Sequence, residues 1–192
     1  MLEFLKHIDT DFFLFLNGIH SEPLDVIMFQ ITNKVNWIPL YLFLIFIAVK
    51  DLKRESIWLI LGVILLILLT DLIVSGVMKP YFERLRPSRD PALEGLVHIV
   101  NEYRGGMYSF ASGHAATSFC LATFMWLALS KVRSWIWILF LWAAVFSYSR
   151  IYLGVHYPGD ILAGAAIGSL IAIAGYRMYT WLFRIREGRK SE

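Results

Sequence analysis

The sequence has little charge and a single cysteine, and both scarcities limit the class of protein that it can encode. Charged residues account for 17% of the 192 residues, whereas hydrophobic residues account for 58% and aromatic residues for 16%. Soluble globular domains carry more charge and fewer apolar residues. Cys120 lies in an apolar run, so an intramolecular disulfide is excluded and a buried, unreactive thiol is expected.

Other common features are missing as well. The sequence has no internal repeat or low-complexity segment, and no basic stripe interleaved with aromatic residues of the kind typical of nucleic-acid-binding proteins. No nucleic acid partner is therefore expected, and the net charge of +3 bears on membrane topology instead. The first residues carry acidic side chains and lack a basic leader, which argues against a signal peptide.

Long apolar runs are abundant and indicate a protein of the lipid bilayer. Residues 57–78 read I-W-L-I-L-G-V-I-L-L-I-L-L-T-D-L-I-V-S-G-V-M, which is enough to cross a hydrocarbon core about 30 Å thick at about 1.5 Å per residue. Similar runs predict crossings at 114–130, 134–152 and 159–182. The predicted fold class is therefore all-α, an integral membrane bundle of about five transmembrane helices that forms one domain over residues 1–192.

The beginning of the chain is less regular. Residues 1–20 predict an amphipathic helix that lies at the membrane surface. The polar stretch Thr32–Asn36 predicts a broken first crossing, with helices at 23–33 and 37–50; a short re-entrant or interfacial piece is the alternative.

Three local features predict how the helices are arranged. Asp71, inside the second crossing, is expected to face the bundle interior as a polar clamp. Residues 80–111 form a polar loop with several prolines and glycines, expected to be an active-site loop that carries short helices or acts as a substrate lid. The last crossing has a small-residue face suited to close helix packing, made of Gly164, Ala165, Ala166, Gly168 and Ser169.

A polar stretch separates the last two crossings. Ser149–Asp160 reads S-R-I-Y-L-G-V-H-Y-P-G-D, and it places Arg150, His156 and Asp160 where charged groups are costly and often functional. This pattern indicates nucleophilic catalysis on a phosphate. His156 would attack phosphorus, Asp160 would orient its ring through the other nitrogen, and Arg150 would neutralise phosphoryl oxygens. A helix-capping turn with a surface histidine is the alternative.

Two further stretches favour the catalytic interpretation. Lys79–Pro87 reads K-P-Y-F-E-R-L-R-P, and Tyr108–Ser118 reads Y-S-F-A-S-G-H-A-A-T-S. Together with S-R-(five residues)-H-(three residues)-D, they resemble the three-part signature of the type 2 phosphatidic acid phosphatase superfamily, the integral-membrane lipid phosphate phosphatases. The middle part departs from the pattern at Ala111, where the family usually has proline. This departure affects the predicted rigidity of the loop, since every reactive side chain is present.

The resemblance implies a role for each residue of the signature. His156 would be the nucleophile that forms a phosphohistidine, oriented by Asp160, and His114 would be the general acid that protonates the leaving group. The implied phosphate-binding set is Lys79, Arg86, Ser112, Gly113 and Arg150.

No cofactor or metal ion is expected. The two histidines and the aspartate could serve as ligands, but three fixed cations at the same site would repel a divalent ion, and no carboxylate cluster offsets them. Metal-independent hydrolysis is therefore predicted. Arg84, Arg89 and Arg104 stay open between contacts to a second phosphate or lipid headgroup and a structural or solvated role.

The distribution of lysine and arginine predicts the orientation in the membrane. If the crossings alternate, one side carries Lys50, Lys53, Arg54, Lys131, Arg133, Arg184, Arg186, Arg189 and Lys190. That side, with the C-terminus, is expected to be cytoplasmic. All three motifs then lie at the opposite surface of the cell (inner) membrane, facing the periplasm or exterior.

The expected substrate is a phosphorylated lipid, whose tails stay in the bilayer while its headgroup enters the basic site. Undecaprenyl pyrophosphate is the first choice, and phosphatidylglycerol phosphate, phosphatidic acid and lipid A 1-phosphate are alternatives that fit the resemblance. A protein that binds or translocates lipid phosphates is the non-enzymatic alternative. Against it stands the set of His114, His156 and Asp160, because binding alone requires the cations but not a nucleophile paired with an acid.

Overall fold

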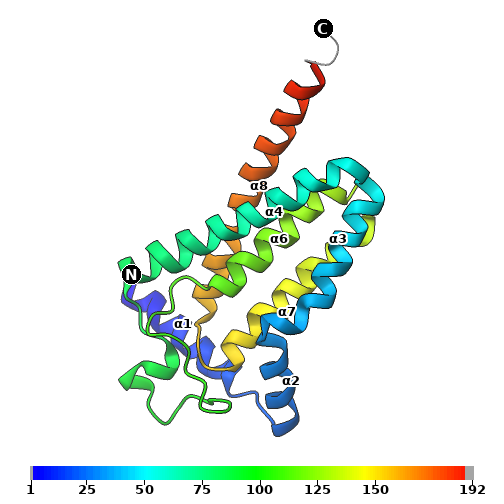
Figure 1. The fold of residues 1–192 in the computed structure, drawn as a ribbon. Helices are drawn as coiled ribbons and strands as arrows, with labels where there is room; N and C mark the ends of the chain where they lie inside the picture. The colour runs from blue at the N-terminus through cyan, green and yellow to red at the C-terminus, as the bar shows by residue number, and fades with distance from the viewer. Residues whose placement is uncertain (1, 189–192) are drawn as a thin grey trace.

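The computed structural model describes residues 2–188, and the side chains of residues 3–182. Its regular elements over this range are helices, and the only strand-like pairing there is an isolated antiparallel bridge between Leu85 and Tyr108. The predicted all-α class is therefore confirmed (Figure 1).

The α-helices follow one another with short connections, except for one long loop between the fifth and sixth. Their bounds are α1 (Leu2–Asn17), α2 (Glu22–Thr32), α3 (Ile38–Leu52), α4 (Ser56–Asp71), α5 (Lys79–Phe82), α6 (Gly113–Leu129), α7 (Ile138–Tyr152) and α8 (Pro158–Gly188). A π-helical segment, η3 (Leu72–Met78), joins α4 to α5. The loop after α5 carries the short 3-10 helices η4 (Pro87–Arg89) and η5 (Pro91–Leu93), as expected for a connection of this length.

Several helical runs have the length and composition of membrane crossings. Within the described residues, these runs are Lys34–Phe82, Ser134–Tyr152 and Pro158–Leu182, and α6 is a shorter apolar helix. The first run folds back on itself where Lys53 has a φ of 49°, so that α3 and α4 form a hairpin (Figure 1). The helices α3, α4, α6, α7 and α8 thus account for the predicted crossings.

The helix starts follow from the residues found there. Pro158 occupies the first position of α8, where the missing N–H costs nothing. Ser112 is the N-cap of α6, and its hydroxyl accepts a hydrogen bond from the N–H of Ala115 at 3.4 Å. The polar break before α3 is the 3-10 turn η1 (Lys34–Trp37), so the predicted break between the two helices is confirmed.

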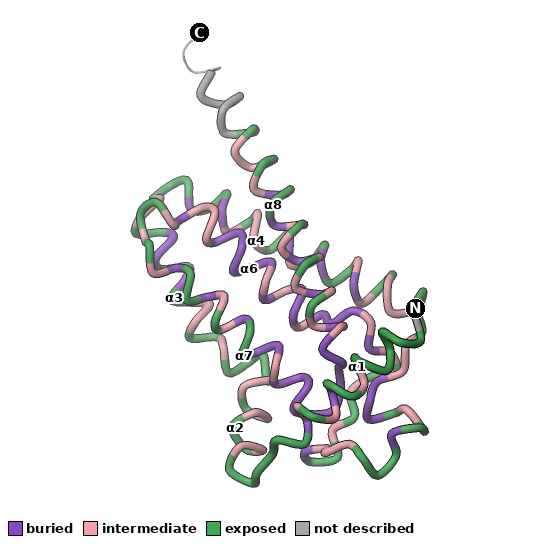
Figure 2. Tube along the Cα trace, turned by 180° about the vertical axis from the view of Figure 1, so that it is seen from behind, coloured by how far each residue is buried: buried purple, intermediate pink, exposed green. Residues whose placement is uncertain are grey.

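Helix α6 lies at the centre of the bundle and packs against α4, α7 and α8. Figure 2 shows buried residues along α6, whereas much of the outer surface of α3 and α4 is exposed, as expected for helices that face lipid. A Cβ atom at Gly164 would lie 2.5 Å from the carbonyl oxygen of Ser112, and one at Gly168 would lie 2.0 Å from that of Ala116. The predicted small-residue face is confirmed at both glycines, although Ala166 is exposed.

The first helix is amphipathic, as predicted, and it has two contrasting sides. Phe12 and Phe15 are exposed and form part of an apolar surface suited to contact with lipid. Phe13 and Asn17 are buried on the opposite side, and the Asn17 amide donates hydrogen bonds to the carbonyl oxygens of Ile151 and Tyr152 at 3.1 and 2.8 Å. The helix is thus attached to the end of α7.

The prediction for Asp71 is wrong in one respect, because its carboxylate lines a cavity of the bundle but does not clamp two helices together. Asp71 is exposed, and its carboxylate accepts a hydrogen bond of 3.0 Å from Ser75 on the next turn instead of pairing with another helix. The reason is its position at the end of α4, beside a cavity where α3 and α4 separate.

Candidate active site

The three sequence motifs meet at one end of the helical bundle. Lys79 begins α5, Ser112 caps α6, Arg150 lies in the last turn of α7, and Asp160 lies in the first turn of α8. The loop between α5 and α6 covers this end (Figure 1). Residues separated by up to half the chain are therefore neighbours, as the alternation of crossings predicts.

The histidine and aspartate of the last motif form a buried pair. Nδ1 of His156 lies 3.4 Å from Oδ2 of Asp160, and the two side chains are almost fully buried. Burial, followed by the charges of Arg86 and Arg150, lowers the pKa of His156 well below its usual value. His156 is therefore a neutral imidazole, with Nδ1 directed at a carboxylate.

The carboxylate of Asp160 is held by more than the histidine. The backbone N–H of Tyr157 donates to Oδ2 at 2.9 Å, and the guanidinium of Arg84 donates to Oδ1 at 2.9 Å. A second nitrogen of Arg84 donates to Asp9 at 2.8 Å, and the other oxygen of Asp9 accepts from the N–H of Gly159 at 2.7 Å. Asp9 thus connects α1 to Gly159 in the first turn of α8, directly before Asp160.

Arg84 was not among the residues that the sequence assigns to the site. It lies between Glu83 and Leu85, and Leu85 pairs with Tyr108 in the antiparallel bridge. Alternate residues of an extended segment point to the same side, so Arg84 and Arg86 of the R-L-R stretch project together. This alternation is the signal that could have identified Arg84.

The other two arginines left open by the sequence have structural contacts. Arg89 donates to the carbonyl oxygens of Gly105 and Gly106 at 2.9 and 3.1 Å. Arg104 donates to the carbonyl oxygen of Ser88 at 2.7 Å. Both therefore hold the loop together.

The three cations of the predicted phosphate site are close enough to interact electrostatically. Arg86 is buried, and it donates to the carbonyl oxygens of Tyr108 and Val155 at 3.1 and 3.3 Å. Burial and the neighbouring charge of Arg150 lower the pKa of Arg86 to about 10, so it stays protonated at neutral pH. Lys79, Arg86 and Arg150 repel one another when no anion is bound, so binding of an anion among them is favourable.

Arg150 has a free hydrogen-bond donor at the site. Its side chain is only 2% exposed, and its terminal nitrogens donate to the hydroxyls of Thr32 at 2.5 Å and Tyr103 at 3.1 Å. Its Nε is buried and has no hydrogen-bond partner within the described part of the chain. A buried unpaired donor on a cation is costly, and an anion would satisfy it.

The remaining predicted residues lie at the start of α6. Ser112 is buried, and its N–H donates to the carbonyl oxygen of Asp160 at 3.0 Å, which fixes α6 to α8. The start of a helix is a position where backbone N–H groups can bind anions. His114 is partly buried, with its ring 5.1 Å from that of Phe146. The structure thus brings together every residue that the sequence assigns to the site.

The described residues 3–182 contain no group of three or more histidine, cysteine, aspartate or glutamate side chains arranged to hold a metal ion. The charged groups at the site are arranged instead as cations around a buried imidazole.

Comparison with known proteins decides the family. A family model described as the PAP2 superfamily matches residues 57–184, which include all three motifs. The chain belongs to the PAP2 superfamily. The resemblance seen in the sequence is thereby confirmed, and this PAP2 protein is a lipid phosphatase, a hydrolase of the membrane.

Several relatives of this PAP2 phosphatase have names that specify their reaction. The chain is 43% identical over 171 residues to a lipid A 4'-phosphatase of Bacteroides thetaiotaomicron, covering 88% of this chain and 75% of the relative. It is 33% identical over 181 residues to a lipid A 4'-phosphatase of Porphyromonas gingivalis, covering 94% of this chain and 76% of the relative. Among solved structures, Aquifex aeolicus LpxE is similar with a TM-score of 0.68 and 29% identity, covering 88% of this chain and 94% of that one.

Proposed function

We propose that this PAP2 phosphatase removes a phosphate group from an acylated, phosphorylated lipid through a phosphohistidine intermediate on His156. The observation that carries the proposal is the buried, neutral His156, oriented by Asp160 and faced by three cations. Binding alone would require the cations only, whereas an oriented neutral imidazole supplies a nucleophile.

In the first step, the lone pair of His156 Nε2 attacks phosphorus. The P–N bond forms as the P–O bond to the lipid breaks, and His114 gives its proton to the departing oxygen. Asp160 accepts the hydrogen bond from Nδ1 and stabilises the positive charge that develops on the ring.

In the second step, water attacks the phosphohistidine. His114, now neutral, takes a proton from the water, and the P–N bond breaks with its electron pair returning to Nε2. Inorganic phosphate leaves, and His156 is again a neutral imidazole. Both steps balance without a metal ion or an external cofactor.

The phosphoryl oxygens are bound by charge and by backbone donors. A phosphate monoester carries about −1.5 to −2 charges near neutral pH. Arg150 supplies its unpaired Nε, and Lys79 and Arg86 supply further positive charge. Ser112 and the N–H of Gly113 stabilise the oxygens from the start of α6.

The names of the relatives favour a lipid A-type substrate over the first choice from sequence, undecaprenyl pyrophosphate. Two relatives that align with most of this chain are lipid A 4'-phosphatases. We therefore assign a phosphate monoester on an acylated sugar headgroup as the substrate, with phosphatidic acid and phosphatidylglycerol phosphate as poorer substrates.

The proposed orientation places this site at the outer surface of the inner membrane. The opposite end of the bundle carries the bidentate pair of Arg133 with Asp51, whose two hydrogen bonds measure 2.8 Å each, and the basic α3–α4 turn. Of the tail cations, Arg189 and Lys190 lie outside the described residues, as do the side chains of Arg184 and Arg186.

Phosphate release by the detergent-purified protein tests the proposal. The assay is run in EDTA with lipid A, phosphatidic acid, phosphatidylglycerol phosphate and undecaprenyl pyrophosphate, for the wild type, His156→Ala and His7→Ala. His7 is an exposed histidine of α1 and serves as the matched control. Release by the wild type and His7→Ala, fastest from lipid A, with none from His156→Ala, supports the proposal. Full activity of His156→Ala, or activity that EDTA abolishes, contradicts it.

A further inference from the structure

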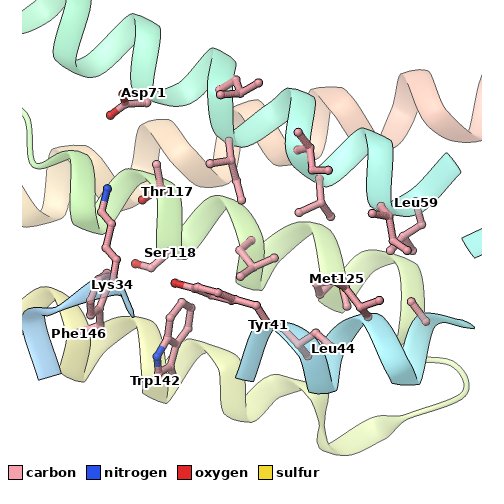
Figure 3. A pocket seen from close by; sticks show the side chains of 18 residues that line it. Lys34, Tyr41, Leu44, Leu59, Asp71, Thr117, Ser118, Met125, Trp142 and Phe146 are labelled. Atoms are coloured by element: carbon pink, nitrogen blue, oxygen red, sulfur yellow. The ribbon is translucent and has the colours of Figure 1, made fainter. Parts of the chain in front are cut away.

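An apolar cavity lies inside the bundle, beside the proposed catalytic site. It has a volume of about 450 Å³ and is lined by residues of α3, α4, α6 and α7 (Figure 3). Ligand-binding cavities in proteins commonly measure about 300–1000 Å³. None of the catalytic or phosphate-binding residues named above lines it.

The two ends of the cavity differ in chemistry. Leu44, Leu59 and Met125 line one end, where the walls are hydrocarbon (Figure 3). Lys34, Asp71, Thr117 and Ser118 gather at the other end, so that a positive charge, a negative charge and two hydroxyls surround the same opening (Figure 3).

The polar end adjoins the catalytic site. Phe146 lines the cavity there, and its ring lies 5.1 Å from that of His114. Thr117 is one turn beyond the phosphate-binding start of α6, and its hydroxyl donates to the carbonyl oxygen of Gly113 at 2.8 Å. Lys34 is an electrostatic neighbour of His114. A molecule with its phosphate beside His156 can therefore extend past Phe146 into the cavity.

The charged groups at the polar end are available to a ligand. The ammonium of Lys34 has no hydrogen-bond or ion-pair partner within residues 3–182. Asp71 is exposed, accepts a hydrogen bond from Ser75 on the next turn, and is an electrostatic neighbour of Lys79. Neither residue belongs to the three motifs, so the phosphatase signature does not account for them.

We infer that this cavity binds one acyl chain of the substrate, and that Lys34 and Asp71 bind the polar linkage between that chain and the phosphate-bearing headgroup. The inference rests on the proposed function and adds a criterion for the substrate. A carbonyl oxygen of an ester or amide accepts from Lys34, and a hydroxyl or amide N–H donates to Asp71. The hydrocarbon walls then hold the chain.

The same polar end disfavours other lipid phosphates. A polyprenyl diphosphate has no carbonyl or hydroxyl between its diphosphate and its chain, so Lys34 and Asp71 would be left without partners. Acylated headgroups with ester or amide linkages and free hydroxyls are therefore the class that fits.

Photo-crosslinking tests the chain site without relying on turnover. The probe is phosphatidic acid with a diazirine near the end of one acyl chain, bound to the His156→Ala protein. We expect adducts on Leu44 and Met125, and about a tenfold loss of adducts when Val63→Phe fills the cavity. Leu69→Phe is the matched control, because Leu69 lies on the same helix, is 41% exposed and does not line the cavity. Adducts confined to outward-facing residues, or equal labelling of the two phenylalanine variants, overturn the inference.

A second variant that fills the cavity keeps the test valid if Val63→Phe does not fold. Ile64 also lines the cavity but is 50% exposed, so Ile64→Trp can extend over the opening without disturbing the core. Both filled proteins are first checked by thermal unfolding. Loss of adducts from either folded variant supports the inference, and retention of adducts in every folded filled variant contradicts it.

Kinetics of Lys34 variants test the linkage site. For an acylated lipid phosphate, Lys34→Met is expected to raise KM about tenfold with kcat nearly unchanged, and Lys34→Arg to restore most of the affinity. For a polyprenyl diphosphate, the same variants leave KM unchanged. An equal rise in KM for both substrates would show that Lys34 is one more phosphate-binding cation, which overturns the inference.

A wild type that releases no phosphate from any lipid contradicts the proposed function instead. The crosslinking experiment still tests the acyl-chain site in that case, because it does not depend on turnover.

Discussion

Arg84 donates a hydrogen bond of 2.9 Å to Oδ1 of Asp160, the buried carboxylate that orients His156. Asp160 is fully buried, and a carboxylate without a compensating charge would be protonated there. Arg84 supplies that charge from the loop, and it also stacks over the ring of Tyr157 at 3.8 Å from the ring centroid. The proposed catalytic pair of His156 and Asp160 therefore contacts a cation outside the recognised signature.

Arg84 is expected to act as a positioning residue. Arg84→Ala should lower kcat about tenfold to a hundredfold, as loss of outer-shell partners does in other sites, because Asp160 becomes protonated or turns away. Arg84→Lys should recover part of the activity, since it restores the charge but not the planar fork that donates to Asp160 and Asp9 at once. The measurement is kcat and KM with lipid A, and KM should stay within about twofold of wild type because Arg84 is not assigned to the phosphate. A rise in KM at constant kcat would instead show that Arg84 binds substrate.

Helix packing predicts a stability effect at Gly168. A Cβ there would lie 2.0 Å from the carbonyl oxygen of Ala116, so Gly168→Ala must push α8 away from α6 and should cost about 1–3 kcal/mol of folding free energy. Ala166→Val, on the exposed side of α8, is the control and should change little. Cys120 is buried, so a thiol-reactive dye in a thermal ramp reports unfolding through this single cysteine. An unchanged melting temperature for Gly168→Ala would contradict the close approach of the two helices.

The pH dependence follows from the environment of His156. Burial first, and then Arg86, Arg150 and Lys79, lower its pKa, so it stays neutral as the pH falls through 6.5, the ordinary histidine value. The acid limb of kcat/KM should therefore lie below pH 6.5, and an alkaline limb is expected in kcat, where the bound phosphate dianion offsets the cations and favours the protonated form of His114. The pH profile should be bell-shaped, and its two limbs report pKa values that belong to the coupled pair of histidines. A flat profile between about pH 5 and 9 would contradict this acid and base assignment.

Removal of Arg86 tests whether the neighbouring positive charges lower the pKa of His156. Arg86→Met takes away a positive charge that disfavours the imidazolium, so the pKa of His156 should rise and the acid limb should move up by about half a unit to one unit. His156 is less neutral at a given acidic pH in this variant, and relative activity at pH 5 to 6 should fall further than at pH 8. An acid limb that does not move would show that burial alone sets the pKa of His156, and one that moves down would contradict the predicted sign.

Most of the site could be predicted because it depends on local spacing and on alternation. The spacing of Arg150, His156 and Asp160 around Pro158 fixes their positions on consecutive helix ends. Alternating crossings then bring Lys79 and Ser112 to the same side. The contacts of Arg84 with Asp9 and Asp160 could not be predicted, since they join positions 75 and 76 residues apart through a loop whose path depends on tertiary packing.

The error at Asp71 has a related cause. A carboxylate inside an apolar run normally faces protein, but this rule assumes that the helix is surrounded where the residue lies. Here α3 and α4 separate around a cavity, and Asp71 lines it together with Lys34 from the polar break before α3. The sequence contained both charges but nothing that indicated their proximity, because the hairpin of α3 and α4 sets it.

Trapping the covalent intermediate tests the central claim most directly. The wild-type protein is mixed with lipid A and sampled within the first turnover, because His114 serves both steps and its loss would slow formation of the phosphohistidine as well as its hydrolysis. The reaction is quenched in alkali, in which phosphohistidine survives, and the peptides are analysed by mass spectrometry. We expect phosphate on His156, absent from the His156→Ala variant and present in His7→Ala. Phosphate on another residue, or no phosphoprotein while the wild type turns over the same lipid, would contradict the account.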